Sequence, residues 1–593
     1  MGATRVVQPW LDKATALEIG DRLIQVGIPE RMDVQEALHL SEGLLMEFLA
    51  LMTTGQRLQQ VLAGQVADLA DPGRQLQRHI ARLLTAAHTL GLSLSAERLG
   101  TLLADLPADY HGCSPTTEIH GLAVDSRHVR HGLAFLAVPG LTHDGHAFVA
   151  QAAAAGAAAL LLQRGRVHAP THPHVWLDDT AAALPQLAAR SFGEPAKQLR
   201  LAGVTGTNGK TTVTYLVAAM LRAAARPHLR IGTAGNWIVD HEAPASFTTP
   251  FPLELQALLA AAVARGATDL IMEVSSHALA QARIEPLRYH AVGLTSFSQD
   301  HLDFHGDMDA YFAAKRLLAS DYLRPDGLAV AAVDAQPRAH EFLAAARDLG
   351  AHAWRASRGR DPDAELCVLE DMSVGPGFDL RVRTPVGEAH LRSPLIGAYN
   401  LDNALVALGL GLGLGLGLDH CLAGLATSRG APGRLERVDL PGVPGPTVVV
   451  DYAHTPDAVA RALEAVRPAC RGRLWIVLGC GGDRDPSKRA PMGRIAAQAA
   501  DQFIATSDNP RTEDPPAIVA QMLADITPAH RHRVREIVDR AAAIDHAITS
   551  AGPDDLILIA GKGHEDYQIL GTTKIHFDDR EHATRALAAR PRP

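Results

Sequence analysis

Several features that define other classes of protein are missing from this sequence. Its five cysteines are scattered without a CxxC pair, which fits a reducing compartment. No long block of lysine and arginine offsets the net charge of -9, so a general nucleic-acid binder is disfavoured. No stretch approaches the roughly 20 apolar residues of a membrane span, and Met1 is not followed by the basic and apolar regions of a secretory signal. These absences predict a cytoplasmic protein without a membrane span.

The length and composition are those of a multidomain globular protein. At 593 residues the chain is too long for one hydrophobic core, and it predicts three or four domains. Hydrophobic residues make up 47% of the chain and charged residues 20%, which is ordinary for a globular protein. Residues 1–92 have apolar positions at helical spacing, interrupted at Asp71-Pro72-Gly73, and carry no chemical motif. We interpret them as a small helical extension, which could serve as a docking module for a protein partner.

From about residue 93 onward, short apolar runs alternate with alanine-rich helical stretches, which predicts an α/β fold. Runs of strand length lie at 134–138, 158–162, 199–204, 269–273, 291–295, 327–333, 447–451, 474–478, 502–505 and 555–560. The chain leaves one unit for the next at about 431–436. In the later two units the polar motifs directly follow strands, where doubly wound sheets bind their ligands.

The clearest chemical motif is Gly206-Thr207-Asn208-Gly209-Lys210-Thr211-Thr212, between a predicted strand and a helix predicted over 213–224. Its two glycines let backbone N–H groups approach phosphate oxygens, and the helix N-terminus adds favourable partial charge. Lys210 can reach the β- and γ-phosphates, and the Thr211 hydroxyl suits Mg²⁺. Val204 stands where the strict Walker pattern has its first glycine, but Gly-Lys-Thr at a strand–helix junction disfavours a chance glycine turn. The motif predicts a bound nucleoside triphosphate.

This loop resembles the ATP loop of the Mur ligase family, which also includes the folylpolyglutamate synthases. Further motifs of that family follow in its order and approximate spacing: Glu273-Val274-Ser275-Ser276-His277, Asp300-His301-Leu302-Asp303, Tyr311-Phe312-Ala313-Ala314-Lys315, Asn400-Leu401-Asp402-Asn403, Asp451-Tyr452-Ala453-His454-Thr455-Pro456 and Gly481-Gly482-Asp483-Arg484-Asp485. The resemblance runs from about residue 93 to residue 593. One departure is Ser296, where the family usually has asparagine after Thr295, and it concerns a local hydrogen bond.

The resemblance implies a three-domain α/β architecture behind the extension over 1–92. It implies a UDP-sugar-binding α/β domain over 93–197, a central ATP-binding domain with a P-loop-type parallel sheet over 198–432, and a C-terminal Rossmann-like domain that binds an amino acid over 433–593. It also implies an ATP-dependent ligase of peptidoglycan precursor synthesis, with ATP and Mg²⁺ as cofactors.

The implied reaction joins a carboxylate to an amine, which is uphill in water. ATP can drive it by phosphorylating the carboxylate to an acyl phosphate, and such a transfer depends on positioning and charge neutralisation. Oxygen ligands suit Mg²⁺, so Thr211 and Glu273 are apt for one ion. By resemblance, His301 and a carbamylated Lys315 hold a second ion, because carbamylation turns an ammonium into an oxygen ligand. Taken alone, these two would be read as a capping histidine and a surface lysine, and the ordered motifs favour the metal site.

The resemblance also implies where the nucleotide-linked substrates bind. Asp125-Ser126-Arg127 looks like the family's UDP-sugar anchor, with Ser126 as a contact to uracil or phosphate. The adenine side of ATP is expected at Asn400 and Asn403. The muramoyl dipeptide is expected at Thr248, Thr249, Ser275, Gln281 and Arg283. Catalytic roles are expected for Lys210, Glu273, His301 and Lys315.

Within the family, Asp508-Asn509-Pro510-Arg511 and Gly561-Lys562-Gly563-His564-Glu565-Asp566 look like the member that adds meso-diaminopimelate to a UDP-muramoyl dipeptide. The far end of this amino acid carries a carboxylate and an ammonium, so its site needs a cation with fork geometry and an anion. Arg511 offers the fork, Asn509 a donor and an acceptor, and Glu565 the anion. The expected site comprises Arg484, Asp508, Asn509, Arg511, Gly561 and Glu565, with Arg484 holding the other carboxylate.

Two alternatives stay open at this point. A ligase of the same fold could add lysine to the same precursor or glutamate to folate, and the set Asn509, Arg511 and Glu565 discriminates against both. A non-catalytic ATP-binding protein could act through residues 1–92, but every expected catalytic residue is present.

The leucine–glycine alternation over 408–418 has a period of two, which on its own indicates a strand. By resemblance, it should continue a helix that begins near Asn400, although each glycine costs about 1 kcal/mol relative to alanine. We predict a helix that ends early, at about Gly413.

Overall fold

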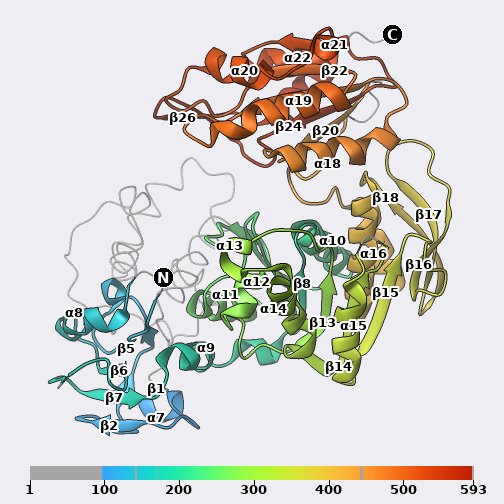
Figure 1. The fold of residues 1–593 in the computed structure, drawn as a ribbon. Coiled ribbons are helices and arrows are strands. Elements are labelled where there is room, and N and C mark those ends of the chain that lie inside the picture. The colour runs from blue at the N-terminus through green and yellow to red at the C-terminus, as the bar shows by residue number, and fades with distance from the viewer. Residues whose placement is uncertain (1–96, 141–142, 169, 335, 441–444, 591–593) are drawn as a thin grey trace, which may run out of the picture.

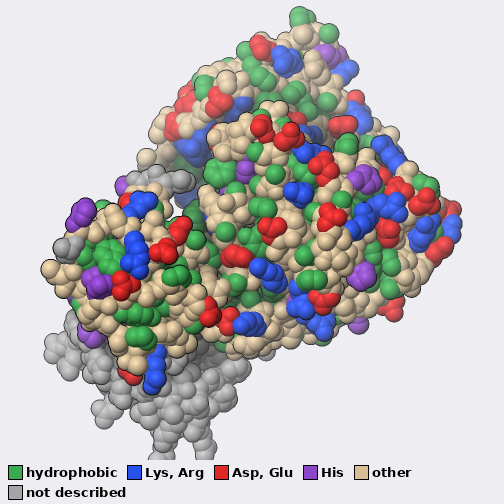
Figure 2. Space-filling view, turned by 60° about the horizontal axis from the view of Figure 1, so that its bottom comes forward, with side chains coloured by type: hydrophobic (Ala, Val, Ile, Leu, Met, Phe, Trp, Pro, Cys, Tyr) green, Lys and Arg blue, Asp and Glu red, His purple; other side chains and the backbone are tan. Residues whose placement is uncertain are grey.

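The structure is a computed structural model and describes residues 97–590 apart from 141–142, 169, 335 and 441–444. The helical extension predicted over 1–92 lies outside the described residues. Within them the chain forms three α/β lobes, each organised around a sheet of five or more strands (Figure 1). None of the described helices combines the length and the apolar composition needed to cross a membrane. On the face drawn in Figure 2, acidic and basic side chains are interspersed and do not form a single basic patch.

The first lobe carries a five-stranded sheet with the order β2-β7-β6-β5-β4. These strands are β2 (Asp109–His111), β4 (Leu122–Ala123), β5 (Ala134–Leu136), β6 (Ala159–Gln163) and β7 (His174–Leu177). All neighbours are parallel except β2 and β7. Two smaller strands and three helices complete the lobe: β1 (Glu97–Arg98), β3 (Glu118–Ile119), α7 (Leu99–Leu102), α8 (Val149–Ala154) and α9 (Thr180–Ser191). The strands predicted over 134–138 and 158–162 are confirmed as β5 and β6.

The central lobe contains an eleven-stranded sheet whose middle is parallel. Its parallel strands are β8 (Arg200–Thr205), β9 (His228–Ile231), β12 (Asp269–Glu273), β13 (Tyr289–Leu294), β14 (Leu323–Ala332), β15 (His352–Ser357) and β16 (Leu366–Asp371). Antiparallel strands extend both edges: β10 (Asn236–Ile238), β11 (His241–Ala243), β17 (Phe378–Thr384) and β18 (Gly387–Ser393). The predicted strand over 269–273 is confirmed with those bounds as β12, and β8, β13 and β14 confirm three more within a few residues.

Helices cover both faces of the central sheet. One face carries α10 (Lys210–Ala223), α16 (Ala398–Gly413) and α17 (Leu418–Thr427), which share a hydrophobic core with the sheet. The other face carries α11 (Pro252–Ala264), α14 (Met308–Ser320) and α15 (Ala339–Asp348). Two short helices, α12 (Ser276–Ala280) and α13 (Leu302–His305), follow strands at the carboxyl edge. The helix predicted over 213–224 is confirmed as α10, which begins three residues earlier at Lys210.

The leucine–glycine alternation is helical, as predicted, and its helix α16 ends at Gly413. The glycines lie where the helix approaches its neighbours closely. A Cβ at Gly409 would stand 2.7 Å from the Val330 side chain on β14, and one at Gly411 would stand 2.8 Å from Met220 Sδ on α10. The period of two therefore reflects close helix packing rather than a strand.

The C-terminal lobe is a six-stranded sheet with the order β19-β20-β24-β21-β22-β23. Its strands are β19 (Glu436–Val438), β20 (Thr447–Asp451), β21 (Leu474–Cys480), β22 (Gln502–Ser507), β23 (Val534–Glu536) and β24 (Leu556–Ala560), parallel except at β19. On one face lie α18 (Pro456–Val466), α19 (Arg489–Ala499) and α20 (Pro515–Leu523), and on the other α22 (Arg540–Ser550) and α23 (Asp579–Ala589). The remaining elements are α21 (Pro528–Arg531) and the hairpin β25 (Tyr567–Leu570) and β26 (Thr573–His576). All four strands predicted in this lobe are confirmed, and 447–451 has the predicted bounds.

Candidate active site

The phosphate loop lies between β8 and α10, at the carboxyl end of a strand in the middle of the central sheet. Gly206 and Gly209 have φ values of +148° and +89°, in the range that favours glycine. A Cβ at Gly206 would collide with the Thr295 hydroxyl, and one at Gly209 would collide with the Asn403 side chain. The loop is thus pressed against the end of β13 and against α16, which explains both glycines of the motif.

Lys210 is the first residue of α10, and its amino group lies over the loop. Nζ donates to Gly206 O at 2.8 Å and to Thr207 O at 3.0 Å. Burial lowers the pKa of Lys210, a shift that the charge of Glu273 opposes and the charge of Arg434 reinforces. Arg434, which lies outside the predicted site, therefore contributes to the electrostatics of Lys210.

Ser296 holds the loop from the end of the neighbouring strand. Asn208 N donates to Ser296 Oγ at 2.9 Å, and Ser296 Oγ donates to Asn208 O at 3.0 Å. Thr207 N donates to Ser296 O at 2.8 Å. Serine at this position therefore makes its own hydrogen bonds to the phosphate loop, where the family usually has asparagine.

Glu273 is the last residue of β12 and pairs in register with Val204 of β8, directly before the phosphate loop. Its side chain is buried, and both of its oxygens accept hydrogen bonds from Thr233: Oε1 from the backbone N at 2.9 Å and Oε2 from Oγ1 at 3.2 Å. A Cβ at Gly232 would collide with Oε1. The carboxylate is therefore held beside the loop by threonine and by a tight backbone approach, and not by arginine.

Lys315, on α14, is almost fully buried next to the loop. Its Nζ donates to Gly206 O at 3.0 Å, the same oxygen that Lys210 contacts, and lies 4.5 Å from the centre of the Tyr311 ring. Burial holds the pKa of Lys315 well below its usual range, and the charge of Lys210 adds to the shift. A buried amine of low pKa differs from the surface lysine that its sequence alone would favour.

His301 stands immediately before α13, with a φ of +53°. Its ring centre lies 4.8 Å from that of His277 and 6.0 Å from that of Tyr311, and His277 lies 5.5 Å from His305. His305 Nε2 is 3.0 Å from Ser276 Oγ. His301 and His305 therefore both contact Tyr311, the same ring that Lys315 covers, and His277 contacts both of these histidines.

The two asparagines expected on the adenine side begin α16 and are buried. Asn400 Nδ2 donates to Ile396 O at 2.9 Å, and Asn403 Nδ2 donates to Asn400 Oδ1 at 3.1 Å. Because Asn403 also contacts Gly209, both side chains are fixed at the edge of the phosphate loop.

Three of the residues expected at the muramoyl dipeptide are linked to Glu273. Thr249 Oγ1 donates to Glu273 O at 2.9 Å and accepts from Ser275 N at 3.0 Å. Thr248 Oγ1 lies 2.9 Å from Thr233 Oγ1, whose hydroxyl donates to Glu273. The threonine pair and the strand end thus form one hydrogen-bonded unit.

Gln281 and Arg283 extend this unit. Arg283 Nε donates to Gln281 Oε1 at 2.8 Å, and its Nη1 lies 3.5 Å from Thr249 O. The guanidinium carbon lies 3.9 Å from the centre of the Phe251 ring, and burial lowers the pKa of Arg283. Its neighbours are therefore an amide and an aromatic ring, not the carboxylate of an ordinary surface ion pair.

Ser126 belongs to the first lobe, where it follows β4 in a short 3₁₀ turn. Its hydroxyl is buried and donates to Gln151 Oε1 at 3.0 Å. Asp125 and Arg127 pair with each other at 2.6 Å on either side of it. The motif is locally ordered, with the hydroxyl oxygen still able to accept a hydrogen bond.

The amino-acid residues come together at the carboxyl ends of β22 and β24. Asn509 Nδ2 donates to Glu565 Oε2 at 2.8 Å, and Asn509 Oδ1 accepts from Lys562 Nζ at 3.2 Å. Lys562 is fully buried and lies 3.4 Å from Glu565 Oε2. A Cβ at Gly561 (φ +116°) would stand 2.6 Å from Asp508 Oδ2. Two motifs about 50 residues apart therefore form one polar network.

Arg511 connects this network to the loop after β21, which is the third loop of the site. It has a φ of +52°, and its Nη1 donates to Gly482 O at 2.7 Å. A Cβ at Gly481 would stand 3.1 Å from the Arg511 guanidinium and 3.8 Å from Arg484 Cγ. Arg484 itself is exposed and shares no hydrogen bond with Arg511 among the contacts that the structure describes. The predicted residues of this site therefore lie on three adjacent loops.

Two members of the site were not predicted. Lys562 lies inside a predicted motif, and its burial between Asn509 and Glu565 could be recognised only from the fold. Burial and the charge of Glu565 raise the pKa of Tyr452, and the charges of Arg434 and Arg484 oppose this shift only in part. The phenol is therefore surrounded by charged groups of the site. The signal available in the sequence was their place in motifs that follow strands.

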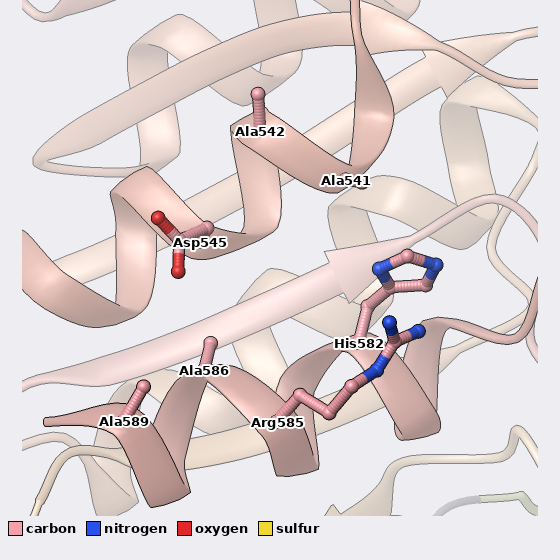
Figure 3. A pocket seen from close by; sticks show the side chains of 7 residues that line it. All are labelled: Ala541, Ala542, Asp545, His582, Arg585, Ala586 and Ala589. Carbon is pink, nitrogen blue, oxygen red and sulfur yellow. The ribbon is translucent and has the colours of Figure 1, made fainter.

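A shallow pocket between α22 and α23 lies away from these motifs (Figure 3). It contains none of the predicted site residues and is lined by Ala541, Ala542, Asp545, His582, Arg585, Ala586 and Ala589.

Three family models match the chain. They are described as the Mur ligase family catalytic domain over residues 118–192, the Mur ligase middle domain over 204–411, and the Mur ligase glutamate ligase domain over 433–563. A curated relative from Gloeobacter violaceus, named UDP-N-acetylmuramoyl-L-alanyl-D-glutamate--2,6-diaminopimelate ligase, is 46% identical over 84% of this chain and 99% of its own length. A relative of the same name from Synechococcus elongatus is 46% identical over 80% of this chain and 94% of its own length.

Solved structures agree with these matches. A structure with the same enzyme name has a TM-score of 0.67 at 30% identity and covers 84% of this chain and 99% of that chain. A Mycobacterium tuberculosis folylpolyglutamate synthase complexed with ADP and AMPPCP has a TM-score of 0.51 at 22% identity, covering 69% of this chain and 96% of that chain, and shares the fold alone. With close relatives along almost their whole length and family matches in all three lobes, this chain belongs to the Mur ligase family.

Proposed function

We propose that this chain is an ATP-dependent, ADP-forming ligase that adds meso-2,6-diaminopimelate to UDP-N-acetylmuramoyl-L-alanyl-D-glutamate in peptidoglycan precursor synthesis. The observation that carries the proposal is the network of Asn509, Lys562 and Glu565, with Arg511 beside it, at adjacent strand ends. The relatives of this chain from Gloeobacter violaceus and Synechococcus elongatus are named as diaminopimelate ligases of this kind. The division into domains at 93–197, 198–432 and 433–593 is part of the same proposal.

ATP would lie with its phosphates against the loop from Gly206 to Thr212 and its adenine beside Asn400 and Asn403. The two glycines bring backbone N–H groups within reach of phosphate oxygens, and the start of α10 adds its dipole. On binding, Lys210 Nζ would exchange the carbonyls of Gly206 and Thr207 for phosphate oxygens. ATP binding is supported by the family and by the ADP and AMPPCP named for its relative of the same fold.

Mg²⁺ would be held by Thr211, Glu273, His301 and Lys315. Among the residues that the structure describes, no three His, Cys, Asp or Glu side chains form a ready metal site. The donor set nevertheless fits Mg²⁺ if Lys315 is carbamylated, because its amine then becomes an oxygen ligand. When bound, the ions supply positive charge between the phosphates and the substrate carboxylate.

The low pKa of Lys315 supports this modification. Carbamylation joins the neutral amine nitrogen to the carbon of carbon dioxide and releases one proton to solvent, and burial favours the neutral amine that this step requires. The carbamate nitrogen keeps one N–H, which could still donate to Gly206 O, and its carboxylate would place a negative group beside the Lys210 ammonium. Glu273 is already held in place by Thr233 and would keep its position during the reaction.

The muramoyl dipeptide would extend from Ser126 in the first lobe to the Thr249, Ser275 and Arg283 unit in the central lobe. This unit ends at Glu273, so the carboxylate to be activated would reach the γ-phosphate beside that strand end. Arg283 is half-buried against Phe251, where a guanidinium binds a carboxylate more strongly than it does in open water.

The diaminopimelate would sit at the strand ends of the C-terminal lobe. Arg511 would hold the distal carboxylate, and Glu565 and Asn509 would hold the distal ammonium, while Arg484 would bind the other carboxylate. Asp508 and Gly561 shape the floor of the site, because their close approach leaves no room for a side chain. The amine would then be free to attack the acyl phosphate delivered from the central lobe.

We also propose that the reaction takes place in the cytoplasm. All five cysteines are free, and three of them are buried, which fits a reducing compartment. ATP, the UDP-linked dipeptide and diaminopimelate are the small-molecule partners, and a protein partner for residues 1–92 stays a prediction.

A product-resolved assay tests the proposal. The purified protein is incubated with ATP, Mg²⁺ and the UDP-muramoyl dipeptide, with or without meso-diaminopimelate, and ADP and the nucleotide product are measured by mass spectrometry. We expect ADP and a product heavier by one diaminopimelate residue only when all components are present. Absence of product with every amino acid tested would contradict the ligase assignment.

A further inference from the structure

The two largest fully buried side chains among the described residues are both arginines of the C-terminal lobe, Arg489 and Arg540. Each is the first residue of a helix, α19 or α22, on opposite faces of the sheet. A buried ion pair is often no more stable than a well-packed apolar pair of similar volume, so stability alone does not explain why two arginines are buried here.

Arg540 joins two strand ends. Its Nε and Nη2 donate to the two oxygens of Asp579 at 2.7 and 2.6 Å, and this ion pair is fully buried. The same guanidinium donates from Nη2 to Ala560 O at 3.0 Å and from Nη1 to Ser507 O at 3.3 Å. Ser507 and Ala560 are the last residues of β22 and β24, immediately before the two amino-acid motifs.

Arg489 joins two loops in the same manner. Its Nη1 and Nη2 donate to Glu513 Oε2 and Oε1, both at 2.8 Å, and Nη2 also donates to Gly481 O at 3.1 Å. Nη1 further contacts Gln521 Oε1 at 2.7 Å. Glu513 Oε1 accepts Asp483 N at 2.6 Å, so the carboxylate completes the link.

The two arginines thereby connect all three loops that bear the amino-acid residues. Arg489 ties the loop after β21, which carries Arg484, to the loop after β22. Arg540 ties the start of that second loop, which carries Asn509 and Arg511, to the loop after β24. A planar guanidinium suits this task because its donors form a rigid fork that reaches a carboxylate and a carbonyl together. Lysine could not keep the same set of directions.

We propose that Arg489 and Arg540 are positioning residues that set the spacing of the three loops and thereby the choice of amino acid. This inference rests on the proposed function. Neither arginine has to touch the substrate, because each acts through the backbone carbonyls and carboxylates that it holds. Displacements of about 1 Å in such a constellation change rates by up to a hundredfold.

The test compares the double variant Arg540→Met/Asp579→Leu with the wild-type protein. Replacing both partners avoids leaving an unpaired buried charge, which is the main reason a single replacement fails to fold. We expect KM for diaminopimelate to rise by roughly tenfold or more and the preference over lysine to fall, while KM for ATP changes little. If this ion pair only stabilised the fold, the double variant would have a lower melting temperature, but KM for diaminopimelate would not rise relative to KM for ATP.

Arg467→Met is the matched control. Arg467 also pairs with an aspartate, Asp501, at 2.8 Å and holds a backbone carbonyl, Ala499 O, at 2.9 Å. It lies at the opposite end of β22, away from the amino-acid loops. We expect a change in melting temperature only.

Arg489→Lys is a milder second test that keeps the charge and removes the fork. We expect the same rise in KM for diaminopimelate, with KM for ATP nearly unchanged. Unchanged KM for diaminopimelate and unchanged preference in both folded variants would overturn the positioning role while the proposed function stands. If the wild-type protein adds neither amino acid, the proposed function fails, and this inference falls with it.

Discussion

The nucleotide region and the amino-acid region of this molecule are built in different ways. The phosphate loop consists of consecutive residues, and its shape depends on glycine conformations and on backbone contacts to Ser296. The amino-acid region consists of three loops from distant parts of the chain, which side chains such as Asn509 and Lys562 hold together. The first kind of site can be recognised from one motif, whereas the second needs the fold to show what supports it.

The largest effect is expected at Lys315, which lies beside the phosphate loop. We predict that Lys315→Ala abolishes ligation, a loss of roughly a hundredfold or more, because it removes a ligand of the Mg²⁺ that would neutralise charge on the transferring phosphate. ATP binding, measured by calorimetry, should survive because Lys210 and the loop remain. The exposed Lys197→Ala serves as the control and should keep full activity. Equal activity of Lys315→Ala and wild type, with or without added bicarbonate, would remove Lys315 from the mechanism.

The next effect concerns the amino-acid loops. Lysine lacks the distal carboxylate, so its binding leaves the remaining guanidinium donors of the half-buried Arg511 without a partner, at a cost of ~1–3 kcal/mol for each donor shielded from water. We therefore predict that Arg511→Ala selectively reduces a preference for diaminopimelate on the order of hundreds-fold. The measurement is kcat/KM for both amino acids in wild type, Arg511→Ala and the exposed control Arg471→Ala. A preference that survives Arg511→Ala intact would assign the selection to other residues.

A smaller effect is expected where the phosphate loop meets its neighbour. Ser296→Ala removes the two side-chain hydrogen bonds to Asn208, each worth ~0.5–1.5 kcal/mol, so KM for ATP should rise by about fivefold or more. The turnover with saturating ATP should change less, and KM for diaminopimelate should stay constant. Ser296→Asn introduces the usual family residue and should restore most of the affinity. A rise in KM for the amino acid equal to that for ATP would show that the two regions are not independently held.

The smallest effect is expected from the N-terminal extension. Residues 1–92 carry none of the expected catalytic residues, so we predict that a protein beginning near Leu92 folds and ligates at the wild-type rate. Circular dichroism and the ligation assay check the two parts of this prediction. Loss of ligation in a folded truncated protein would mean that the extension contributes to the site or to domain closure.

The positions of the strands could be predicted where apolar runs end in polar or glycine-rich turns. Asp269–Glu273 and Thr447–Asp451 have the predicted bounds for this reason. The edge strands β17 and β18 did not stand out, because charged residues alternate along them and leave no continuous apolar run. The helix over Ala398–Gly413 followed from the family resemblance, while its periodicity alone indicated a strand.

The site residues that belong to recognisable motifs could be predicted from the sequence. The phosphate loop and the amino-acid motifs follow strands, Glu273 ends one, and the fold brings each set together at strand ends. The supports of the amino-acid loops could not be predicted, because Arg540 contacts residues 20 to 39 positions away and lies at the start of an ordinary helix. Such partners are defined only by strand order, which sequence periodicity does not contain.

A competition experiment tests the assigned activity most directly. The wild-type protein receives ATP, Mg²⁺, the UDP-muramoyl dipeptide and equal concentrations of meso-diaminopimelate and L-lysine, and mass spectrometry quantifies the two products. We predict that the diaminopimelate product exceeds the lysine product on the order of a hundredfold, because lysine leaves guanidinium donors of the half-buried Arg511 unpaired. Equal amounts of the two products would contradict the assigned specificity.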